Sequence, residues 1–288
     1  MPVYSMNCFQ LPAELCSELD RLIANFWSGS TRDKRKLSWV AWKKLITSKD
    51  TGGLGFRDFK LSNQALLANH IWKIMKRPDS LVYRLLKARY FEDGFFFSAT
   101  KGHKPSYGWN SLRFGRDLLA TGVQFNIGDG NNTKMGVDPW LPTNPPRPPR
   151  LINENDMEKS VKLLIHESSP QWDDMEIQRL IDPRDHYLIH NIYLPSTPTA
   201  DDYLCSCSKD GQYTVKSGYW QALSLARGDN TPKALLATNP DIAKGIWKLY
   251  ITPKLKHFLW RIASRAVGVA NNLRRRNILV KLVLLSMF

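Results

Sequence analysis

An adjacent pair of carboxylates, Asp201 and Asp202, is the first feature of the sequence that could support chemistry. Two such groups on a tight hairpin can hold divalent cations for phosphoryl transfer. The residues before them include Pro195 and Pro198, where such a site needs a strand. The pattern therefore favours an acidic pair in a loop over a polymerase centre.

A second candidate is the pair His186 and His190, whose spacing would place both on one helical face, with Asp182 or Asp185 as a third metal ligand. An H-E-x-x-H pattern, which would strengthen this assignment, does not occur. The sequence also has no G-x-S-x-G elbow and no nucleotide-binding fingerprint. We therefore predict no catalytic residue, no metal site and no cofactor.

Three glycines follow a helix rich in tryptophan and lysine in the stretch KLSWVAWKKLITSKDTGGLGFRDF, Lys36 to Phe59. A phosphate-binding loop needs G-x-G-x-x-G or G-x-x-x-x-G-K-[ST], because its backbone amides must converge at a helix N-terminus. Gly52, Gly53 and Gly55 have neither spacing. We expect a turn that ends the helix, with lysines available to phosphates.

Length, composition and the four cysteines limit the class of protein. The chain has 288 residues, 43% of them hydrophobic, which is enough for one large or two ordinary domains. Neither Cys8 and Cys16 nor Cys205 and Cys207 have the C-x2-C spacing of a zinc site, and we expect reduced, structural thiols. Neither a membrane span nor a signal peptide is recognised, so we expect an intracellular protein, nuclear or cytoplasmic.

Positive charge is concentrated at the two ends of the chain. The net charge is +15, from 41 Lys and Arg against 26 Asp and Glu. Residues 1–110 carry 18 basic and 9 acidic residues, residues 111–240 carry 13 and 16, and residues 241–288 carry 10 and 1. This distribution predicts two places where a polyanion can bind. An ordinary solvated basic surface is the alternative.

The first third of the sequence predicts amphipathic helices. One follows Pro12, and Ser62 and Ser80 are suited to cap two more, the last with Leu81, Leu85 and Leu86 facing inward. Basic and aromatic residues alternate along the last two helices, a combination that can neutralise phosphates and stack on bases. The alternative is that the aromatics are core residues and the charges ordinary helix surface. The first candidate surface consists of Lys73, Lys76, Arg77, Arg84 and Lys87.

A β-hairpin and a proline-rich linker are expected in the middle of the chain. Residues alternate in VQFNIGDGNNTKMGVDPW around Asp129-Gly130-Asn131, as in a hairpin. The stretch Thr143 to Arg150, TNPPRPPR, has four prolines in eight residues and is expected to be an extended linker.

The last recognisable helix begins at Thr252 and Pro253, a cap followed by a favourable first position. We expect its core face to consist of Leu255, Phe258, Leu259, Ile262 and Ala266. A basic stripe with Lys254 and His257 lies on a separate face. The second candidate nucleic-acid surface consists of Arg261, Arg265, Arg274, Arg275 and Arg276.

Many stretches of the sequence occur in the order seen in plant LINE-type (non-LTR) retrotransposon reverse transcriptases, which the chain resembles over nearly its whole length. They include RKLSWVAWKKL, GGLGFRDF, NQALLANHIWKI, LLKARYF, IGDG, DPWLP, DGQYTVKSGYW, IWKLYITPKLKHFLWR and NNLRRRNI. The resemblance is to the part downstream of the polymerase palm.

The resemblance implies a fold and a division into domains. We expect an α+β, mainly α-helical fold with a helical thumb-like region, a β-hairpin element and a second small α+β unit. Residues 1–110 would form the thumb-like region, 111–142 a helix and hairpin connection, 143–150 the linker, and 151–288 a reverse transcriptase zinc-binding-like domain.

Departures from the family pattern bear on function. In similar proteins the polymerase centre lies upstream and the zinc ligands follow NNLRRRNI, where this chain continues as LVKLVLLSMF, so we expect neither. Ser28, Gly136, Cys205 and Cys207 stand where such proteins usually carry aromatics. A buried aromatic replaced by glycine leaves a cavity that costs about 3 to 5 kcal/mol unless its surroundings collapse.

The expected function is non-catalytic binding of RNA or DNA through backbone contacts of low sequence specificity. A separate palm-bearing reverse transcriptase is an expected partner, and no membrane is involved. The alternative is an inert or partner-dependent orphan fragment, and an active polymerase has the least support.

Overall fold

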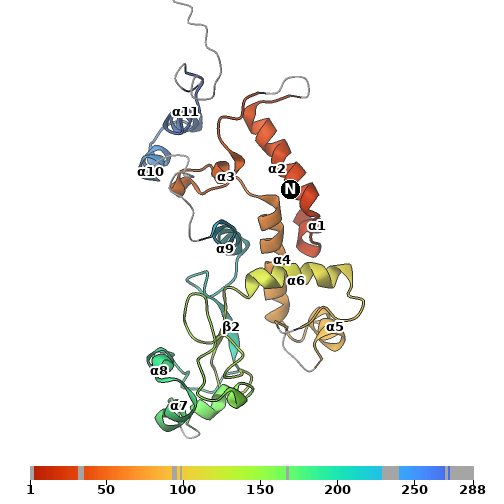
Figure 1. The fold of residues 1–288 in the computed structure, drawn as a ribbon, viewed down its shortest axis with the longest axis vertical. Helices are drawn as coiled ribbons and strands as arrows, with labels where there is room; N and C mark the ends of the chain where they lie inside the picture. The colour runs from red at the N-terminus through yellow and green to blue at the C-terminus, as the bar shows by residue number, and fades with distance from the viewer. Residues whose placement is uncertain are drawn as a thin grey trace, which may run out of the picture. The chain divides into compact units, whose positions relative to one another are not determined.

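The computed structural model describes residues 3–31, 36–92, 96–97, 99–166, 169–228, 240–269 and 272 of the 288-residue chain. Helices predominate, and the described residues contain one sheet of two strands (Figure 1). The predicted class, α+β and mainly α-helical, is confirmed. None of the helices in this described part combines the length and apolar character that a bilayer crossing needs.

The α-helices are α1 (Val3–Cys8), α2 (Ala13–Ser28), α3 (Trp42–Leu45), α4 (Phe59–Met75), α5 (Leu81–Tyr90), α6 (Tyr107–Leu119), α7 (Asp174–Leu180), α8 (Pro183–His190), α9 (Val215–Arg227), α10 (Pro240–Lys248) and α11 (Pro253–Ala263). The 3₁₀ turns are η1 (Lys49–Thr51), η2 (Glu154–Asp156) and η3 (Val161–Leu164), and the strands are β1 (Val123–Asn126) and β2 (Asp202–Cys205).

The chain divides into two compact units, each discontinuous in sequence. Unit 1 consists of Met1–Gln10 and Ser62–Ala226, and unit 2 of Leu11–Leu61 and Arg227–Phe288. The predicted domains 1–110, 111–142, 143–150 and 151–288 are continuous segments and remain a prediction from sequence. The compact units group those segments differently.

The sheet of unit 1 pairs two strands that are far apart in sequence. β1 and β2 are antiparallel, with Val123 opposite Cys205 and Asn126 opposite Asp202. Val123 and Phe125 are buried on one face, as alternation requires. The predicted hairpin around Asp129-Gly130-Asn131 is therefore wrong. The alternating pattern correctly indicated a strand, but its partner lies beyond the loop rather than across a tight turn.

Unit 1 has a core around two stacked tryptophans. The rings of Trp140 and Trp172 lie 5.9 Å apart at 18° to each other, and Trp140 is fully buried. Both indole N–H groups are satisfied, by Met135 O and Ile192 O, each at 3.0 Å. Phe125 of β1 and aliphatic side chains from η3, α7 and α8 complete this core.

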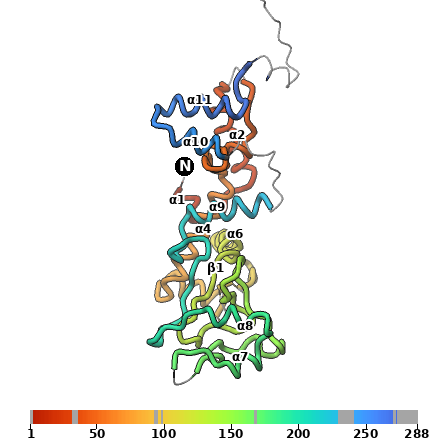
Figure 2. Tube along the Cα trace, turned by 90° about the vertical axis from the view of Figure 1, so that its left-hand side faces the viewer, coloured from red at the N-terminus to blue at the C-terminus, as the bar shows by residue number. Residues whose placement is uncertain are grey.

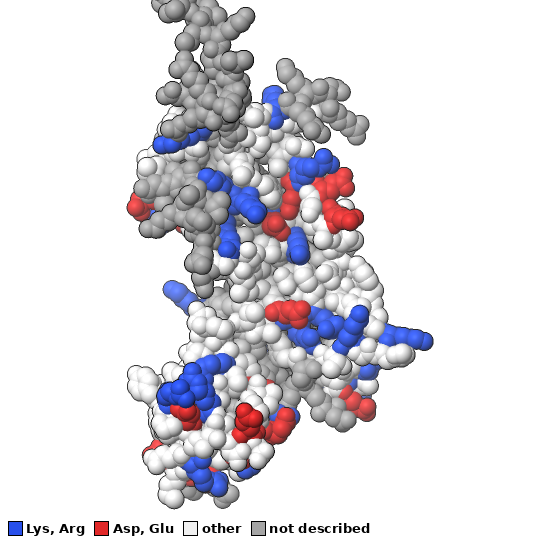
Figure 3. Space-filling model, viewed as in Figure 1, with Lys and Arg blue, Asp and Glu red and all other residues white. Residues whose placement is uncertain are grey.

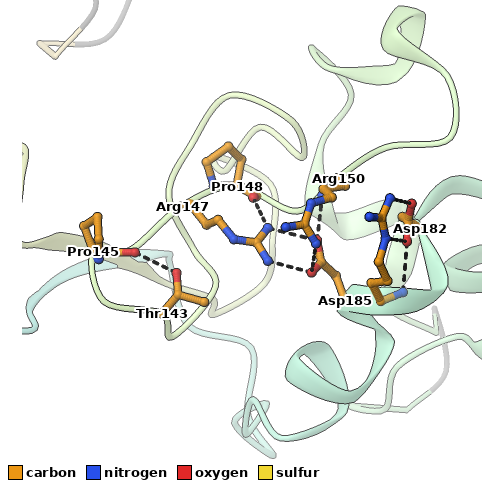
Figure 4. Close-up of polar contacts among 8 residues, drawn as sticks. Thr143, Pro145, Arg147, Pro148, Arg150, Asp182 and Asp185 are labelled. Atoms are coloured by element: carbon orange, nitrogen blue, oxygen red, sulfur yellow. Dashed lines mark hydrogen bonds and ion pairs between the residues drawn. The ribbon is translucent and has the colours of Figure 1, made fainter.

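The proline-rich segment 143–150 lies within unit 1 and packs against its core. Pro146 and Pro149 are buried, and Leu141 N donates to Arg147 O at 3.0 Å. Arg147 then reaches α8, where its two Nη atoms donate to the Asp185 carboxylate at 2.9 and 2.6 Å (Figure 4). Proline-rich composition indicated an extended backbone, but an extended chain can also lie against a core.

The core of unit 2 forms where α11 meets the glycine turn. Trp260 is fully buried, and its indole Nε1 donates to Gly52 O at 2.9 Å. Val40, Leu45, Leu54 and other apolar residues pack around it. α10 lies beside α11, as Figures 1 and 2 both show, and contacts η1 as well. The predicted glycine turn is present and anchors the last described helix.

The buried face of α11 differs from the prediction. Leu255, Phe258 and Ile262 are each about half exposed, while Trp260 and Ala266 are buried. Trp260 has the larger apolar surface to bury, and it also needs a hydrogen-bond acceptor for its N–H. Gly52 O supplies that acceptor, and this orients the helix.

Helix starts follow the local sequence in most cases. The Ser80 side chain accepts from Tyr83 N at 3.3 Å and caps α5, and Pro253 is the first residue of α11. Ser62 instead lies inside α4, whose first turn is capped by Asp58, which accepts from Leu61 N at 2.9 Å. Of the α5 leucines predicted to face inward, Leu86 is buried.

The other two α5 leucines, Leu81 and Leu85, are 76% and 58% exposed.

Gly136 leaves no cavity of the kind that was predicted. A Cβ there would lie 2.7 Å from Leu151 Cδ1 and 2.9 Å from Met157 Cα, so neighbouring groups occupy the space.

Candidate nucleic-acid interface

The carboxylates of Asp201 and Asp202 are both engaged within unit 1. Asp201 Oδ1 accepts from the amides of Gly128 and Gly130 at 2.7 and 2.9 Å, and its Oδ2 accepts from Asn132 N and Thr133 Oγ1. Asp202 pairs with Lys76 Nζ at 2.5 Å. Asp201 thus organises the loop after β1, whereas Asp202 is the first residue of β2 and not part of a loop.

The His186 and His190 pair also makes protein contacts. His186 Nε2 lies 2.9 Å from Ile181 O, and His190 Nε2 lies 3.5 Å from Asp174. The proposed third ligand Asp185 is bound to Arg147 instead. Within the described ranges, no group of three or more His, Cys, Asp or Glu could hold a metal ion.

Asp185 is the most enclosed charge of this region. It is 1% exposed, accepts both Nη atoms of Arg147, and also accepts Arg150 N at 2.8 Å (Figure 4). The hydrogen bonds from Arg147 lower the pKa of this carboxyl. On the neighbouring turn, exposed Arg184 pairs with Asp182 at 2.9 Å. Both arrangements secure α8 and neither leaves a carboxylate for a ligand.

The cysteines near the sheet form a hydrogen-bonded pair of free thiols. Cys205 is buried at the end of β2, and the pKa of its thiol is raised by the hydrogen bond with Cys207 and by burial. The same interaction lowers the pKa of Cys207.

Four of the five basic residues of the first candidate surface lie on the surface of unit 1. Lys73 on α4, Arg77 just after it, and Arg84 and Lys87 on α5 are exposed, and none has an acidic partner in the described ranges. Figure 3 shows Lys and Arg atoms gathered beside α5. Lys76 is different, because it pairs with Asp202 and donates to Tyr203 O at 2.8 Å. Its charge is neutralised.

The aromatics of the first surface have structural roles. Trp72 is buried, and its ring lies 6.4 Å from Tyr213. Tyr83 packs edge-on against Phe91, and Tyr90 stacks on Trp109 at 4.2 Å. Each of these rings packs against another aromatic ring of unit 1, and Trp72 belongs to the core, in line with the alternative.

The second candidate surface lies in unit 2. Arg261 is exposed on α11, and its Nε donates to Ala266 O at 3.4 Å. Arg265 is also exposed; it follows the C-cap of α11 and has a left-handed φ of 54°. Arg274, Arg275 and Arg276 lie outside the described residues.

The division into units redistributes the charge that the sequence showed at both ends. By sequence, unit 2 has 22 Lys and Arg against 8 Asp and Glu, a net charge of +14. Unit 1 has 19 against 18, a net charge of +1. The basic part of residues 11–61 and the basic end of the chain therefore belong to the same unit.

A pocket of about 500 Å³ opens on unit 2. Its lining includes the aromatic rings of Trp27, Trp39 and Phe258 and the cations of Lys254 and Arg261, and none of its described lining residues is acidic. Basic residues of the pocket were visible in the sequence as one helical stripe. The aromatic walls were missed, because they come from α2, the segment before α3, and α11.

His257 also lines this pocket, and its ring packs against two tryptophans. Its ring centre is 5.6 Å from that of Trp27 and 5.4 Å from that of Trp247. Burial and the nearby Lys49 charge lower the pKa of His257, so the ring is neutral at pH 7. It contributes a flat surface rather than a positive charge.

Comparisons with known proteins bear on the family. Residues 213–282 match the family model described as zinc-binding in reverse transcriptase. "Uncharacterized mitochondrial protein AtMg00310" of Arabidopsis thaliana is 47% identical over 150 residues, which cover 52% of this chain and 97% of that protein. "Putative ribonuclease H protein At1g65750" of the same plant is 28% identical over 287 residues, 96% of this chain and 44% of that protein. No solved structure is significantly similar to the chain.

The residues present in the matched region do not fit a zinc ion. Residues 213–282 contain no cysteine and one histidine, His257. A structural zinc site needs four Cys or His ligands. The His257 ring is packed between Trp27 and Trp247, and its buried Nδ1 has no hydrogen-bond partner among the described groups.

The match to AtMg00310 covers almost all of that protein, whereas the chain spans less than half of the length of At1g65750. The first of these relationships shows the family. The match of residues 213–282 to the reverse transcriptase family model relates that family to reverse transcriptase. The chain therefore belongs to a family of plant retroelement proteins related to reverse transcriptase, which includes AtMg00310.

Proposed function

We propose that the chain binds RNA or DNA strands through their backbones and does not itself catalyse their synthesis, as the thumb-like and zinc-binding-like part of a LINE-type reverse transcriptase. The observation that carries the proposal is the net charge of +14 on unit 2 against +1 on unit 1. A surface with this charge attracts polyanions, because each phosphate contact releases condensed counterions.

We propose a non-catalytic chain because of the contacts that Asp201 and Asp202 make. Asp201 uses both oxygens to hold the loop after β1, and Asp202 is paired with Lys76. Both carboxylates therefore make contacts within unit 1, which supports a role other than metal binding. The chemistry would then be supplied by a separate palm-bearing protein, in the nucleus or the cytoplasm.

Salt dependence of binding tests the proposal. Fluorescence anisotropy with a labelled RNA/DNA hybrid and a labelled single strand should give an affinity that falls steeply with salt and depends little on sequence. Primer extension by the isolated chain would overturn the non-catalytic part. Failure to bind either ligand at low salt would overturn the binding part.

Two matched sets of substitutions locate the surface. The unit 2 set is Lys254→Gln, Arg261→Gln, Arg265→Gln and Arg274→Gln. The unit 1 set is Lys73→Gln, Arg77→Gln, Arg84→Gln and Lys87→Gln. Each lost phosphate contact should lower the slope of log K against log salt by about 0.7 for a single strand. We expect the larger reduction from the unit 2 set.

A second candidate function is partner-dependent folding or protein binding, and exposed apolar side chains favour it. On α2, Leu22 and Phe26 are 52% and 85% exposed, and on α5 Leu81 is 76% exposed. Apolar side chains gathered on exposed helices are typical of interaction surfaces. Sedimentation at physiological salt distinguishes the candidates, because a self-sufficient nucleic-acid-binding protein should remain monomeric and bind no hydrophobic dye.

A further inference from the structure

We propose that the pocket of unit 2 takes a single unpaired base of a nucleic-acid strand, with the neighbouring phosphates held by Lys254 and Arg261. This inference rests on the proposed function and adds the part of the ligand that is recognised. It assigns unit 2 a preference for single strands over duplexes.

The walls of the pocket are suited to a flat ring. Trp27 is 37% exposed and is held from behind by Phe56, edge-on at 5.3 Å, and by His257 at 5.6 Å. Phe258 is 51% exposed on α11. A base that stacks on such rings gains affinity regardless of its identity, because every base has a π-face.

The cations lie on the same helix as one wall of the pocket. Lys254, Phe258 and Arg261 occupy positions i, i+4 and i+7 of α11, which share one helical face. Neither Lys254 nor Arg261 has an acidic partner within the described ranges, and the Arg261 Nε bond to Ala266 O restrains that guanidinium. Phosphates on both sides of a stacked base would meet these two charges.

The shape and charge favour an unpaired base over the other occupants of an aromatic pocket. The volume of about 500 Å³ lies within the range of ordinary ligand sites, so one nucleoside can enter. A paired base inside a duplex cannot place its face on these rings without leaving its stack. A purely apolar peptide would leave two cations at the rim without partners, whereas a nucleotide supplies both a ring and an anion.

The test compares ligands that share phosphates but differ in bases. Binding of the full chain is measured to an oligouridylate and to an abasic oligonucleotide of equal length. Stacking of one base is expected to make the oligouridylate bind about 5- to 150-fold more tightly than the abasic strand. Phe258→Leu should remove most of this difference and leave the affinity for the abasic strand unchanged.

A matched control is available on α2, where Phe26 is 85% exposed and does not line the pocket. Phe26→Leu should leave both affinities unchanged. Trp27→Phe keeps an aromatic wall, so it should retain the preference for bases while reducing the fluorescence quenching that the oligouridylate causes, and Trp39 should account for the remainder. Circular dichroism of each variant confirms that it is folded.

The outcomes separate the inference from the proposed function. Equal affinity for the two ligands, or a Phe258→Leu variant that keeps the full preference for bases, would overturn the pocket and leave backbone binding intact. If neither ligand binds at low salt, the proposed function itself fails. Quenching by an apolar peptide without quenching by the oligouridylate would overturn the pocket in favour of a protein partner.

Discussion

Replacing Asp185 by asparagine is expected to destabilise unit 1 by about 2 to 3 kcal/mol. The carboxylate is 1% exposed and receives both Nη atoms of Arg147 and the backbone N–H of Arg150. Asparagine keeps one acceptor and turns an amide donor toward the guanidinium, so a charge-assisted hydrogen bond becomes a donor facing a donor. Breaking a fully buried pair costs about 3 to 5 kcal/mol, and the 31% exposure of Arg147 reduces that cost because its charge can regain water.

Thermal unfolding of the full chain, followed by circular dichroism, measures this effect. In a folding unit of this size each kcal/mol shifts Tm by about 2 to 4 °C, so the expected loss is about 4 to 12 °C. Hydrogen exchange should speed up in residues 147–151 and in α8, which the carboxylate joins. Arg184→Gln is the matched control, because it breaks an exposed pair with Asp182 on the same helix and should leave Tm unchanged.

Two results would refute this reasoning. An Asp185→Asn variant with the Tm of the parent would mean that the segment 143–150 is held without the ion pair. Equal losses from Asp185→Asn and Arg184→Gln would mean that burial of the carboxylate has no energetic consequence. A double variant with Arg147→Gln should lose clearly less than the sum of the two single losses, since both act on one interaction.

Three further predictions concern other named groups. Burial raises the pKa of Asp138 from 3.8 to about 6, so the contribution of this carboxyl to stability is present below pH 3.8 and is lost as the pH rises through 6. Asp138→Asn should therefore raise Tm at pH 8 and raise it much less at pH 4. An equal gain in Tm at both pH values would contradict the assignment. Asp201→Ala removes the acceptor of three amides and a hydroxyl, so amide exchange in residues 128–133 should accelerate at least about tenfold, with unchanged exchange as the opposing result. In Gly53→Ala the new Cβ would lie 1.9 Å from Thr47 Oγ1. This overpacking should lower the stability of unit 2 by about 1 to 3 kcal/mol, measured by urea unfolding with tryptophan fluorescence. An unaltered unfolding midpoint would show that the turn can shift.

Features with local causes could be predicted from the sequence. The cap of α5 at Ser80 and the start of α11 at Pro253 depend on residues within one helical turn, and both occur as expected. The turn at the three glycines follows from their spacing for the same reason. The mainly helical class follows from the many apolar repeats of helical period.

Features with distant causes could not be predicted. The loop after β1 resembles a hairpin turn in sequence, but Asp201, more than 65 residues away, accepts its amides. The same holds for the candidate surface, where Lys76 forms an ion pair with Asp202, 126 residues along the chain. Counting charges finds basic segments, but only contacts of long sequence separation show which charges remain unpaired.

The α11 helix shows how a local rule can choose the wrong face. The spacing of Leu255, Phe258 and Ile262 satisfies helical periodicity, and these residues are nevertheless half exposed. The indole of Trp260 needs both burial and a hydrogen-bond acceptor, and it decides which face of α11 is buried. Phe258 thereby becomes available at the pocket, a consequence that no pattern of hydrophobic residues shows.

The hydrogen bond from Trp260 to Gly52 joins residues 208 positions apart, and this has a consequence for synthesis on the ribosome. At about 5 to 20 residues per second, some 10 to 40 seconds pass between the emergence of the two partners. During that interval residues 11–61 wait without the helix that covers Leu45 and Leu54, while the intervening residues 62–226 can already condense around their own tryptophans. Translation that stops before codon 260 would therefore release a polypeptide in which residues 11–61 lack the helix that covers Leu45 and Leu54. Its exposed apolar side chains would make it a substrate for chaperones or proteases.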